Sequence, residues 1–418
     1  MEHHVYDLIG IGSGVFNLSL AALLDEQKFD NIIFFEKNPS VLWHNGLLLE
    51  TSALQVSFLK DLVTLVDPTS KYSYLNYLKV RNILYQFINR KSNFVSRNQF
   101  QHYFRWVAEQ LPFIKFNSKV SKIEYDGQYF MVTVNNKIYK SYHIAVATGI
   151  TPIIPDCTKP FLGEKIFHIY KYNTYKKYLI DQDILIVGGG QSGAEVFYDQ
   201  MLLNNQKSIS WYGKRIYFGQ LEDNSFVNDY YTPSFVKSFQ KLTFPSRRHF
   251  LDKLSLSCNG INEVLINNIY SLIFERRFFS DRQYQYHISP GYIIDTVELD
   301  NDKLIVKLRH WDNQPEVIKK VDRVILATGF MADSFNMLKN ILDPDITLDS
   351  LKIKTNFELE WKNMNQNHIF IQNTSMMAIG PADPNLSIAA WRAAMIVNTL
   401  LNKELYTCYP DSPIINYI

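Results

Sequence analysis

The hydrophobic positions of this chain alternate between short continuous runs and helical stripes. Val5–Ile9 is an apolar run of strand length, the following segment carries four leucines between residues 18 and 24, and Asn31–Phe35 is a second run. Short apolar runs are typical of strands buried on both faces, whereas residues three or four apart share one face of a helix. The order therefore predicts a strand, a helix over Asn17–Leu24 and a parallel strand.

The same pattern returns about 180 residues later. Asp183–Val187 and Ser208–Tyr212 are apolar runs with a helical segment between them, which predicts a second strand–helix–strand unit. Between the two units, Arg97–Gln110 has aromatic residues on one stripe and is expected to be helical. A further helical pattern covers Glu263–Arg276, and residues 40–80 have no clean period.

Two copies of one short turn suggest how the chain is divided. Ala147-Thr148-Gly149 and Ala327-Thr328-Gly329 each follow an apolar strand. The repetition predicts a first domain of residues 1–160 and 330–418, interrupted by a second domain of residues 161–329, with residues 216–290 as an insertion. The expected fold class is α/β, with two Rossmann-like dinucleotide-binding domains and a small, mainly helical substrate region.

Composition excludes several classes of protein. The 418 residues carry a formal net charge of +2, with 46% hydrophobic and 20% charged residues, so nothing favours nucleic acid or an anionic membrane. No apolar run reaches the roughly 20 residues of a membrane span. The three cysteines are isolated, and no leader segment is recognised, so a cytoplasmic protein with reduced thiols is expected. No residue is assigned to a metal.

Glycines stand where the first strand gives way to its helix. Gly10, Gly12 and Gly14 form this turn, and Val15 occupies the third position of the G-x-G-x-x-G fingerprint. A helix N-terminus offers free N–H groups and a positive dipole end to a pyrophosphate. Glu36 ends the next strand, where an acidic side chain would hold a ribose hydroxyl. The turn therefore predicts a dinucleotide site.

The second turn matches the full fingerprint with Gly188, Gly190 and Gly193. The residues after its second strand are basic, Lys214 and Arg215, where the first unit has an acid. A guanidinium at this place suits a 2′-phosphate, which favours NADPH over NADH.

Longer motifs resemble one family, the lysine/ornithine N-monooxygenases of siderophore biosynthesis. The resemblance rests on residues 10–19, on the block from Gln55 to Leu78, on Gly188–Glu195, on Asn224–Asn228 and on Asp383–Arg392. It covers essentially the whole chain, and the block 55–78 is its most specific part. The details resemble the L-lysine N6-monooxygenase and diamine branch more than the ornithine branch.

The resemblance implies a flavin-dependent N-hydroxylation. NADPH would reduce FAD, O2 would give a C4a-hydroperoxyflavin, and an uncharged primary amine would take its distal oxygen. The flavin carries the chemistry, so no residue is expected to act as acid or base, and Gln55, Lys60 and Asn228 would position the reactants. NADP+ would remain bound. A homo-oligomer is a further expectation, of a size that the sequence leaves open.

The resemblance also assigns individual residues. The substrate would contact Lys60, Asn228, Asn259 and Ser387. The two cofactors would contact Gly10, Gly12, Gly14, Asn17, Glu36, Trp43, His44, Gln55, Thr148, Gly149, Gly188, Gly190, Gln191, Ser192, Gly193, Lys214, Arg215, Thr328 and Gly329. Without the resemblance, Lys60 beside Asp61 would be interpreted as an exposed ion pair.

Alternatives remain at this stage. L-Lysine N6 is the leading substrate, and L-ornithine, putrescine, cadaverine and histamine stay open. Phe161, Gly163 and His168 resemble the fingerprint of Baeyer–Villiger and S-oxidising flavin monooxygenases, although the spacing to the histidine is one residue too long. A flavin-binding protein without turnover is the alternative outside the enzymes.

Overall fold

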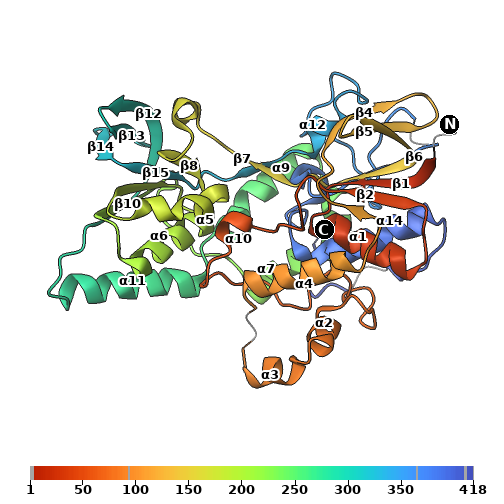
Figure 1. Cartoon of the computed structure of the whole chain (residues 1–418), viewed down its shortest axis with the longest axis horizontal. Coiled ribbons are helices and arrows are strands. Elements are labelled where there is room, and N and C mark those ends of the chain that lie inside the picture. The colour runs from red at the N-terminus through yellow and green to blue at the C-terminus, as the bar shows by residue number, and fades with distance from the viewer. Residues whose placement is uncertain (1–3, 93–94, 364–365, 409–411, 418) are drawn as a thin grey trace.

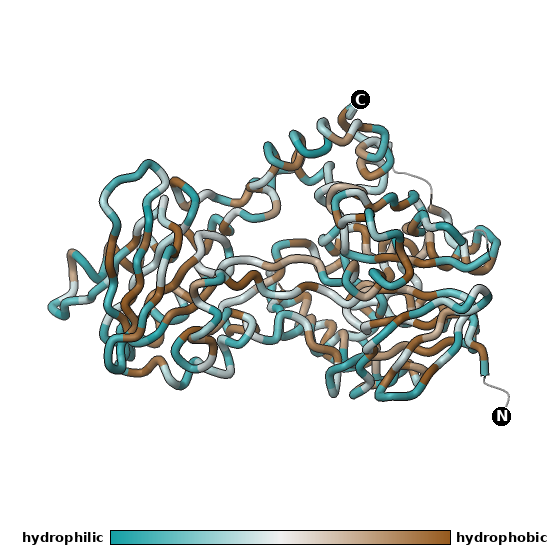
Figure 2. Tube along the Cα trace, turned by 90° about the horizontal axis from the view of Figure 1, so that it is seen from above, coloured by the Kyte–Doolittle hydropathy of each residue, from teal (hydrophilic) through white to brown (hydrophobic). Residues whose placement is uncertain are grey.

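The computed structural model describes residues 4–92, 95–363, 366–408 and 412–417. The chain forms two lobes, each built on a mainly parallel sheet (Figure 1). Apolar segments run through the interior of both lobes (Figure 2). In the described residues, no helix is long and apolar enough to cross a membrane.

The first sheet has the strand order β3-β2-β1-β6-β5-β4. Strand β17 also pairs with β6, along the part of β6 that follows its pairing with β5. Its strands are β1 (Val5–Ile11), β2 (Ile32–Phe35), β3 (Ile114–Lys115), β4 (Val120–Tyr125), β5 (Phe130–Val134), β6 (Lys137–Val146) and β17 (Ile369–Ile371). The parallel part is buried on both faces, because alternate residues such as Leu8 and Ile9 belong to different hydrophobic cores.

The second sheet is parallel, in the order β11-β10-β9-β15-β8, and carries an antiparallel sheet beside it. The parallel strands are β8 (Ile166–His168), β9 (Asp183–Val187), β10 (Ser208–Gly213), β11 (Tyr286–Pro290) and β15 (Arg323–Leu326). The antiparallel strands are β12 (Tyr292–Asp300), β13 (Lys303–His310) and β14 (Val317–Val321).

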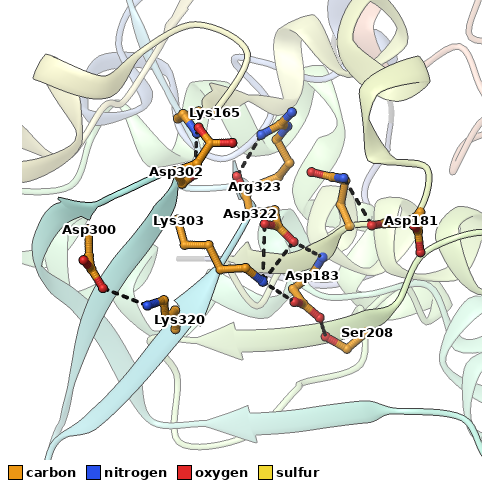
Figure 3. Close-up of polar contacts among 11 residues, drawn as sticks. Lys165, Asp181, Asp183, Ser208, Asp300, Asp302, Lys303, Lys320, Asp322 and Arg323 are labelled. Atoms are coloured by element: carbon orange, nitrogen blue, oxygen red, sulfur yellow. Dashed lines mark hydrogen bonds and ion pairs between the residues drawn. The ribbon is translucent and has the colours of Figure 1, made fainter.

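Charged side chains connect these two sheets (Figure 3). Lys303 Nζ on β13 lies 2.8 Å from Asp183 Oδ2 and 3.4 Å from Asp322 Oδ1, and Ser208 Oγ donates to Asp183 Oδ1 over 2.8 Å. Half-exposed ion pairs of this kind contribute little to stability. The apolar core that β12–β14 share with β9 and β15 therefore holds the antiparallel sheet in place.

Helices cover the sheets and fill the connection between β10 and β11. They are α1 (Val15–Glu26), α2 (Tyr74–Val80), α3 (Leu84–Asn89), α4 (Arg97–Glu109), α5 (Tyr172–Tyr175), α6 (Gln191–Leu203), α7 (Ser225–Asn228), α8 (Pro233–Phe239), α9 (Phe244–Lys253), α10 (Ser255–Asn259), α11 (Glu263–Phe278), α12 (Ser334–Leu338), α13 (Met376–Ile379) and α14 (Ala389–Leu400). Short 3-10 turns include η1 (Asn45–Leu47), η3 (Ile169–Lys171) and η6 (Leu386–Ile388).

Two short strands connect the lobes, β7 (Ile150–Pro152) and β16 (Phe330–Ala332). They pair in antiparallel fashion directly after the two Ala-Thr-Gly turns, and Figure 1 shows β7 between the lobes. The chain thus leaves the first sheet and returns to it at neighbouring points.

The expected insertion of residues 216–290 needs one correction. Residues 286–290 are β11, an edge strand of the second sheet, because Ile209 on β10 pairs with Tyr286. The connection before it is mainly helical, as expected, and contains α7–α11. α8 and α9 reach the first lobe, where Arg247 Nη1 donates to the Met377 carbonyl over 3.1 Å.

Candidate functional site

The first glycine-rich turn presses against the end of β6. Gly12 has φ +82°, and a Cβ on it would lie 2.4 Å from the Ala147 carbonyl oxygen, so only glycine fits. Gly14 is the N-cap of α1. Among the described residues, no side chain caps this end, and apart from its chain neighbours nothing lies within 4 Å of its ideal Cβ. The free N–H groups of α1 therefore face open space.

The fingerprint of this turn lies two residues later than the sequence suggested. Gly10 is inside β1, where a Cβ would meet the Phe34 ring at 2.0 Å, so its role is packing within the sheet. Gly12 and Gly14 are the first two fingerprint positions, and Asn17 is the third. Val15 was wrongly placed at this position because the three glycines at 10, 12 and 14 allow two alignments.

Asn17 closes the turn through its side chain. Its Nδ2 lies 2.7 Å from the Gly12 carbonyl, 3.1 Å from the Ala145 carbonyl and 3.3 Å from the Ile11 carbonyl, and its Oδ1 accepts from Gln372 Nε2. The residue is fully buried. The structure thus places Asn17 beneath the turn, with its amide engaged by protein atoms.

Glu36 also organises this turn. Its Oε2 accepts the Ser13 backbone N–H over 2.9 Å, and its Oε1 accepts from the backbone and side chain of Asn38. Ser13 Oγ is buried and has no partner among the described residues. An open helix N-terminus, a hydroxyl without a partner and a carboxylate at the end of β2 fit the pyrophosphate and ribose of FAD.

The second turn repeats this frame in the other lobe. Gly188 has φ +138°, and a Cβ would lie 2.1 Å from the Ala327 carbonyl oxygen, while Gly190 is the uncapped N-cap of α6. Gly193 takes the place that Asn17 has in the first turn, since a Cβ there would meet the Gly188 carbonyl at 2.2 Å. Trp211 Nε1 donates to that same carbonyl over 2.8 Å.

The basic pair lies beside this turn. Lys214 is exposed, and Arg215 Nη1 donates to the Asn259 carbonyl over 2.8 Å. The same carbonyl is 3.5 Å from the ideal Cβ position of Gly190. The structure therefore places Asn259, which was expected at the substrate, next to the second dinucleotide turn.

The two Ala-Thr-Gly turns stand at the lobe connection. Thr148 Oγ1 donates to Ser334 Oγ over 3.1 Å, and Thr328 Oγ1 donates to the Ile153 carbonyl. Gly149 and Gly329 both have positive φ, at 82° and 90°.

His168 holds the second of these turns. Its Nε2 donates to the Gly329 carbonyl over 3.1 Å, and its Nδ1 accepts the Tyr170 N–H over 3.3 Å. Burial lowers the pKa of His168 to about 4, so the neutral ring supports the connection near neutral pH.

A buried ion pair, which no sequence motif indicated, joins the lobes. Arg97 Nη1 and Nη2, on α4, lie 2.8 and 2.7 Å from the two carboxylate oxygens of Glu195, on α6. Both side chains are nearly inaccessible. Gln191 completes the link, because its Nε2 donates to Glu195 and its Oε1 accepts the Asn262 N–H. Ser192 follows it in the first turn of α6, half-buried.

Trp43 and His44 precede η1, the part of the first lobe that packs on the second. A Cβ on the next-but-one residue, Gly46, would lie 2.2 Å from the Tyr170 carbonyl, so η1 sits directly on η3. His44 is exposed at the surface, and desolvation by the surrounding protein and then the Arg97 cation lower its pKa. Gln55, farther along this segment, is exposed.

Lys60 and Asp61 do not pair with each other. Asp61 is buried and accepts from the N–H groups of Val63, Thr64 and Tyr74 at 2.7–2.9 Å. The Lys60 ammonium is half-buried and, within the described residues, no carboxylate pairs with it. Burial lowers the pKa of Lys60. Within the described residues, the charge of this half-buried ammonium is therefore not balanced by an ion pair.

The other two expected substrate residues differ in exposure. Asn228 ends α7 and is exposed, and its Nδ2 donates to the Asp223 carbonyl over 2.8 Å. Ser387 lies in η6, buried, and its Oγ donates to Asn385 Oδ1 over 2.7 Å. Among the described residues, neither of these side chains hydrogen-bonds to Lys60.

Comparisons with known proteins agree with this architecture. The sequence model of the L-lysine 6-monooxygenase/L-ornithine 5-monooxygenase family matches residues 4–332. L-Lysine N6-monooxygenase of Escherichia coli is 32% identical over 407 residues, covering 96% of this chain and 95% of the relative. Putrescine N-hydroxylase of Acinetobacter baumannii is also 32% identical, covering 97% of this chain and 92% of its own length.

A solved structure shares the whole fold. The cadaverine monooxygenase of Erwinia amylovora, bound to FAD, superimposes with a TM-score of 0.89 at 27% identity, covering 99% of this chain and 98% of that one. The predicted class, an FAD- and NADPH-dependent N-hydroxylating monooxygenase, is confirmed at the level of the family. The chain therefore belongs to the L-lysine 6-monooxygenase/L-ornithine 5-monooxygenase family.

Proposed function

We propose that this chain hydroxylates N6 of L-lysine with NADPH and O2. The observation that carries the choice of substrate is the half-buried Lys60 ammonium, which lacks a carboxylate partner within the described residues. An amino acid supplies that carboxylate, whereas a diamine would bring a second cation to the same place. The Escherichia coli relative, an L-lysine N6-monooxygenase, supports this choice.

The two turns provide the cofactor sites of this proposal. FAD would lie on Gly12 and Gly14, with Glu36 at its ribose and Trp43, His44 and Gln55 along its border. NADPH would lie on Gly188 and Gly190, with Lys214 and Arg215 at its 2′-phosphate. When bound, the flavin supplies the activation of O2 and the nicotinamide supplies the electrons.

The chain's own residues would then bind, orient and shield. Lys60 would fix the carboxylate end of lysine, and Asn228 and Ser387 would orient the rest of the substrate. Such positioning raises the effective concentration of the amine at the flavin. The amine must be uncharged to react, so a site without a carboxylate near its terminal nitrogen favours the reactive form.

A decarboxylated amine is the second candidate. The putrescine N-hydroxylase and the cadaverine monooxygenase resemble this chain along its whole length, which keeps diamines open together with ornithine and histamine. We further propose the division into residues 1–160 with 330–418 and residues 161–329, a cytoplasmic site of action and a hydroxylamine product used in siderophore assembly.

The deciding experiment compares amines. Purified protein loaded with FAD is assayed for hydroxylamine formation with lysine, ornithine, putrescine, cadaverine and histamine. We expect the highest kcat/KM for lysine. A higher value for a diamine would reject the proposed substrate and leave the N-hydroxylation intact.

Lys60→Ala tests the carboxylate contact. Loss of a charge-assisted hydrogen bond costs about 1.5–3 kcal/mol, so KM for lysine should rise by about 10- to 150-fold. KM for cadaverine should stay constant or fall, because its second cation would no longer meet the Lys60 ammonium. Lys71→Ala is the matched control, because this lysine lies in the same segment, is 57% exposed and pairs with Asp25. An equal change for both amines would contradict the assignment.

A further inference from the structure

Asn228 stands at the end of a short helix that other parts of the chain hold from two sides. It is the last residue of α7, and the 3-10 turn η5 (Asp229–Tyr231) follows it directly. Its Nδ2 donates to the Asp223 carbonyl, whereas its Oδ1 accepts no hydrogen bond within the described residues. Because this side chain is exposed, the position of Oδ1 depends on how firmly α7 and η5 are held.

Tyr231 attaches η5 to α10. Its ring is buried in the core of the first lobe, and its hydroxyl lies 2.7 Å from Ser257 Oγ and 3.1 Å from Cys258 Sγ. Ser257 Oγ donates its one hydrogen to the Leu254 carbonyl over 2.8 Å. Ser257 therefore accepts from the Tyr231 hydroxyl, and the Cys258 thiol donates to Tyr231 in turn. Burial raises the pKa of Tyr231, so this hydroxyl keeps the proton that it donates.

α10 is itself fixed at the second glycine-rich turn. The carbonyl of its last residue, Asn259, accepts from Arg215 Nη1 over 2.8 Å and lies 3.5 Å from the ideal Cβ position of Gly190. Through Tyr231, the position of Asn228 therefore depends on both the core of the first lobe and the dinucleotide turn of the second.

Tyr417 holds the same turn from a segment far along the chain. Its hydroxyl donates to the Asp229 carbonyl over 2.9 Å, and the same carbonyl accepts from Thr232 Oγ1 over 2.8 Å. The Tyr417 ring packs edge-on against Phe235 of α8, with 5.0 Å between the ring centroids. Since Asp229 follows Asn228 directly, this hydrogen bond fixes the backbone beside the Asn228 amide.

We propose that Tyr231 and Tyr417 are positioning residues for the amine substrate, which act through Asn228. The proposal rests on the role proposed above for Asn228 in orienting the substrate. Neither tyrosine has to touch the amine. Their hydroxyls hold η5 on two sides, so that Asn228 Oδ1 meets an N–H group of the substrate at a fixed place.

The test measures kcat and KM for L-lysine and for cadaverine, by hydroxylamine formation of the full chain with FAD. Tyr231→Phe and Tyr417→Phe each keep the aromatic ring, so the content of bound FAD should not change. For the amine with the higher kcat/KM, each variant should raise KM roughly three- to tenfold, the effect of losing one neutral hydrogen bond. The value of kcat should stay nearly constant, because the two hydroxyls lie outside the reacting atoms.

The double variant Asn228→Ala/Tyr231→Phe separates positioning from a general effect on stability. If Tyr231 acts through Asn228, the KM of the double variant should equal that of Asn228→Ala alone. Tyr125→Phe is the matched control, because the Tyr125 hydroxyl donates to Asn367 Oδ1 over 2.7 Å at the far side of the first lobe. It should leave KM unchanged.

Three outcomes would overturn this proposal alone and leave the role of Asn228 standing. They are an unchanged KM in both tyrosine variants, additive effects in the double variant, and an equal rise of KM in Tyr125→Phe. An unchanged KM in Asn228→Ala would overturn the proposal together with the role of Asn228, whereas hydroxylamine formed by the wild type would still support N-hydroxylation.

Discussion

The two glycine-rich turns share one backbone arrangement and differ in the residue at the third fingerprint position. In both, a glycine with positive φ lies on the carbonyl of an Ala-Thr-Gly alanine, and two residues later another glycine opens the helix. The third position is Asn17 in the first turn and Gly193 in the second. Backbone contact thus determines this arrangement, whereas the residue at the third position, which we call the closing residue, can vary.

The closing residue changes what each turn depends on. Gly193 allows α6 to approach the Gly188 carbonyl directly, and Trp211 supplies the hydrogen bond to that oxygen. In the first turn, Asn17 fills the space and supplies the hydrogen bond itself. The first turn therefore relies on one buried amide, and the second on close packing plus a neighbouring strand.

The charge after the second strand of each unit also differs. Glu36 is buried and already bound to the Ser13 N–H, while Lys214 is exposed and the Arg215 guanidinium donates to the Asn259 carbonyl. A buried acid suits a cofactor that stays in place. A basic pair at the surface suits a cofactor that carries a 2′-phosphate.

The largest effect should come from substitutions that disrupt the backbone of one glycine-rich turn at a time. Gly12→Ala should release FAD and leave the protein colourless, while Gly188→Ala should keep the yellow colour and raise KM for NADPH at least roughly tenfold. Both changes add a Cβ where only glycine fits, and backbone strain alone costs about 1–3 kcal/mol. Absorbance of bound flavin and steady-state kinetics measure the two outcomes.

Gly14→Ala is the control for this pair, because no protein atom lies within 4 Å of its ideal Cβ. The apoprotein should melt at an unchanged temperature, and only FAD affinity should fall. A lower melting temperature without FAD would show that the turn, and not the cofactor, needs this glycine.

The next effect concerns the ion pair that connects the two units. Glu195→Ala leaves the Arg97 guanidinium buried without its partner, so the free energy of unfolding should fall by about 3–5 kcal/mol. Chemical denaturation measures this loss. Glu124→Ala, which removes a half-exposed pair with Lys122, should change stability by less than about 1 kcal/mol. Equal losses would mean that the lobes are not held by this pair.

A smaller loss is expected from exchanging the closing residue. Asn17→Gly makes the first turn resemble the second but leaves the Gly12 and Ala145 carbonyls without their donor. The cost of unpaired buried groups, about 1–3 kcal/mol, should appear in denaturation of the apoprotein. No change would mean that water replaces the amide and that the two closures are interchangeable.

Sequence patterns predicted the main strands and helices of both lobes because their hydrophobic residues recur with the period of a strand or a helix. The strand Val5–Ile9 and the helix Arg97–Gln110 agree with β1 and α4 within two residues. The helices between β10 and β11 were harder to predict, since α8 and α9 are short. α8 buries Val236 in the core of the first lobe, whereas α9 has no buried residue and meets that lobe through Arg247. These contacts depend on a distant surface and leave no helical period in the local sequence.

Some residues of the candidate site could likewise be predicted from local sequence, and others could not. The glycines, Lys214 and Arg215 could be found from local motifs, although the register of the first turn could not. Arg97 and Glu195 are 98 residues apart, so their pairing is a property of the lobe arrangement. One local signal existed, since a cation at the start of a helix is unfavourable next to the dipole and suggests a specific partner.

The smallest effect concerns the basic pair that distinguishes the second turn from the first. Arg215→Ala should raise KM for NADPH about tenfold, equivalent to about 1.4 kcal/mol, and leave KM for NADH nearly unchanged, because only NADPH has the 2′-phosphate. Lys207→Ala is the control, an exposed lysine before the opposite end of β10. An equal loss for both nucleotides would mean that Arg215 acts through the Asn259 carbonyl on the shape of the turn, and the basic pair would then no longer explain a preference for NADPH.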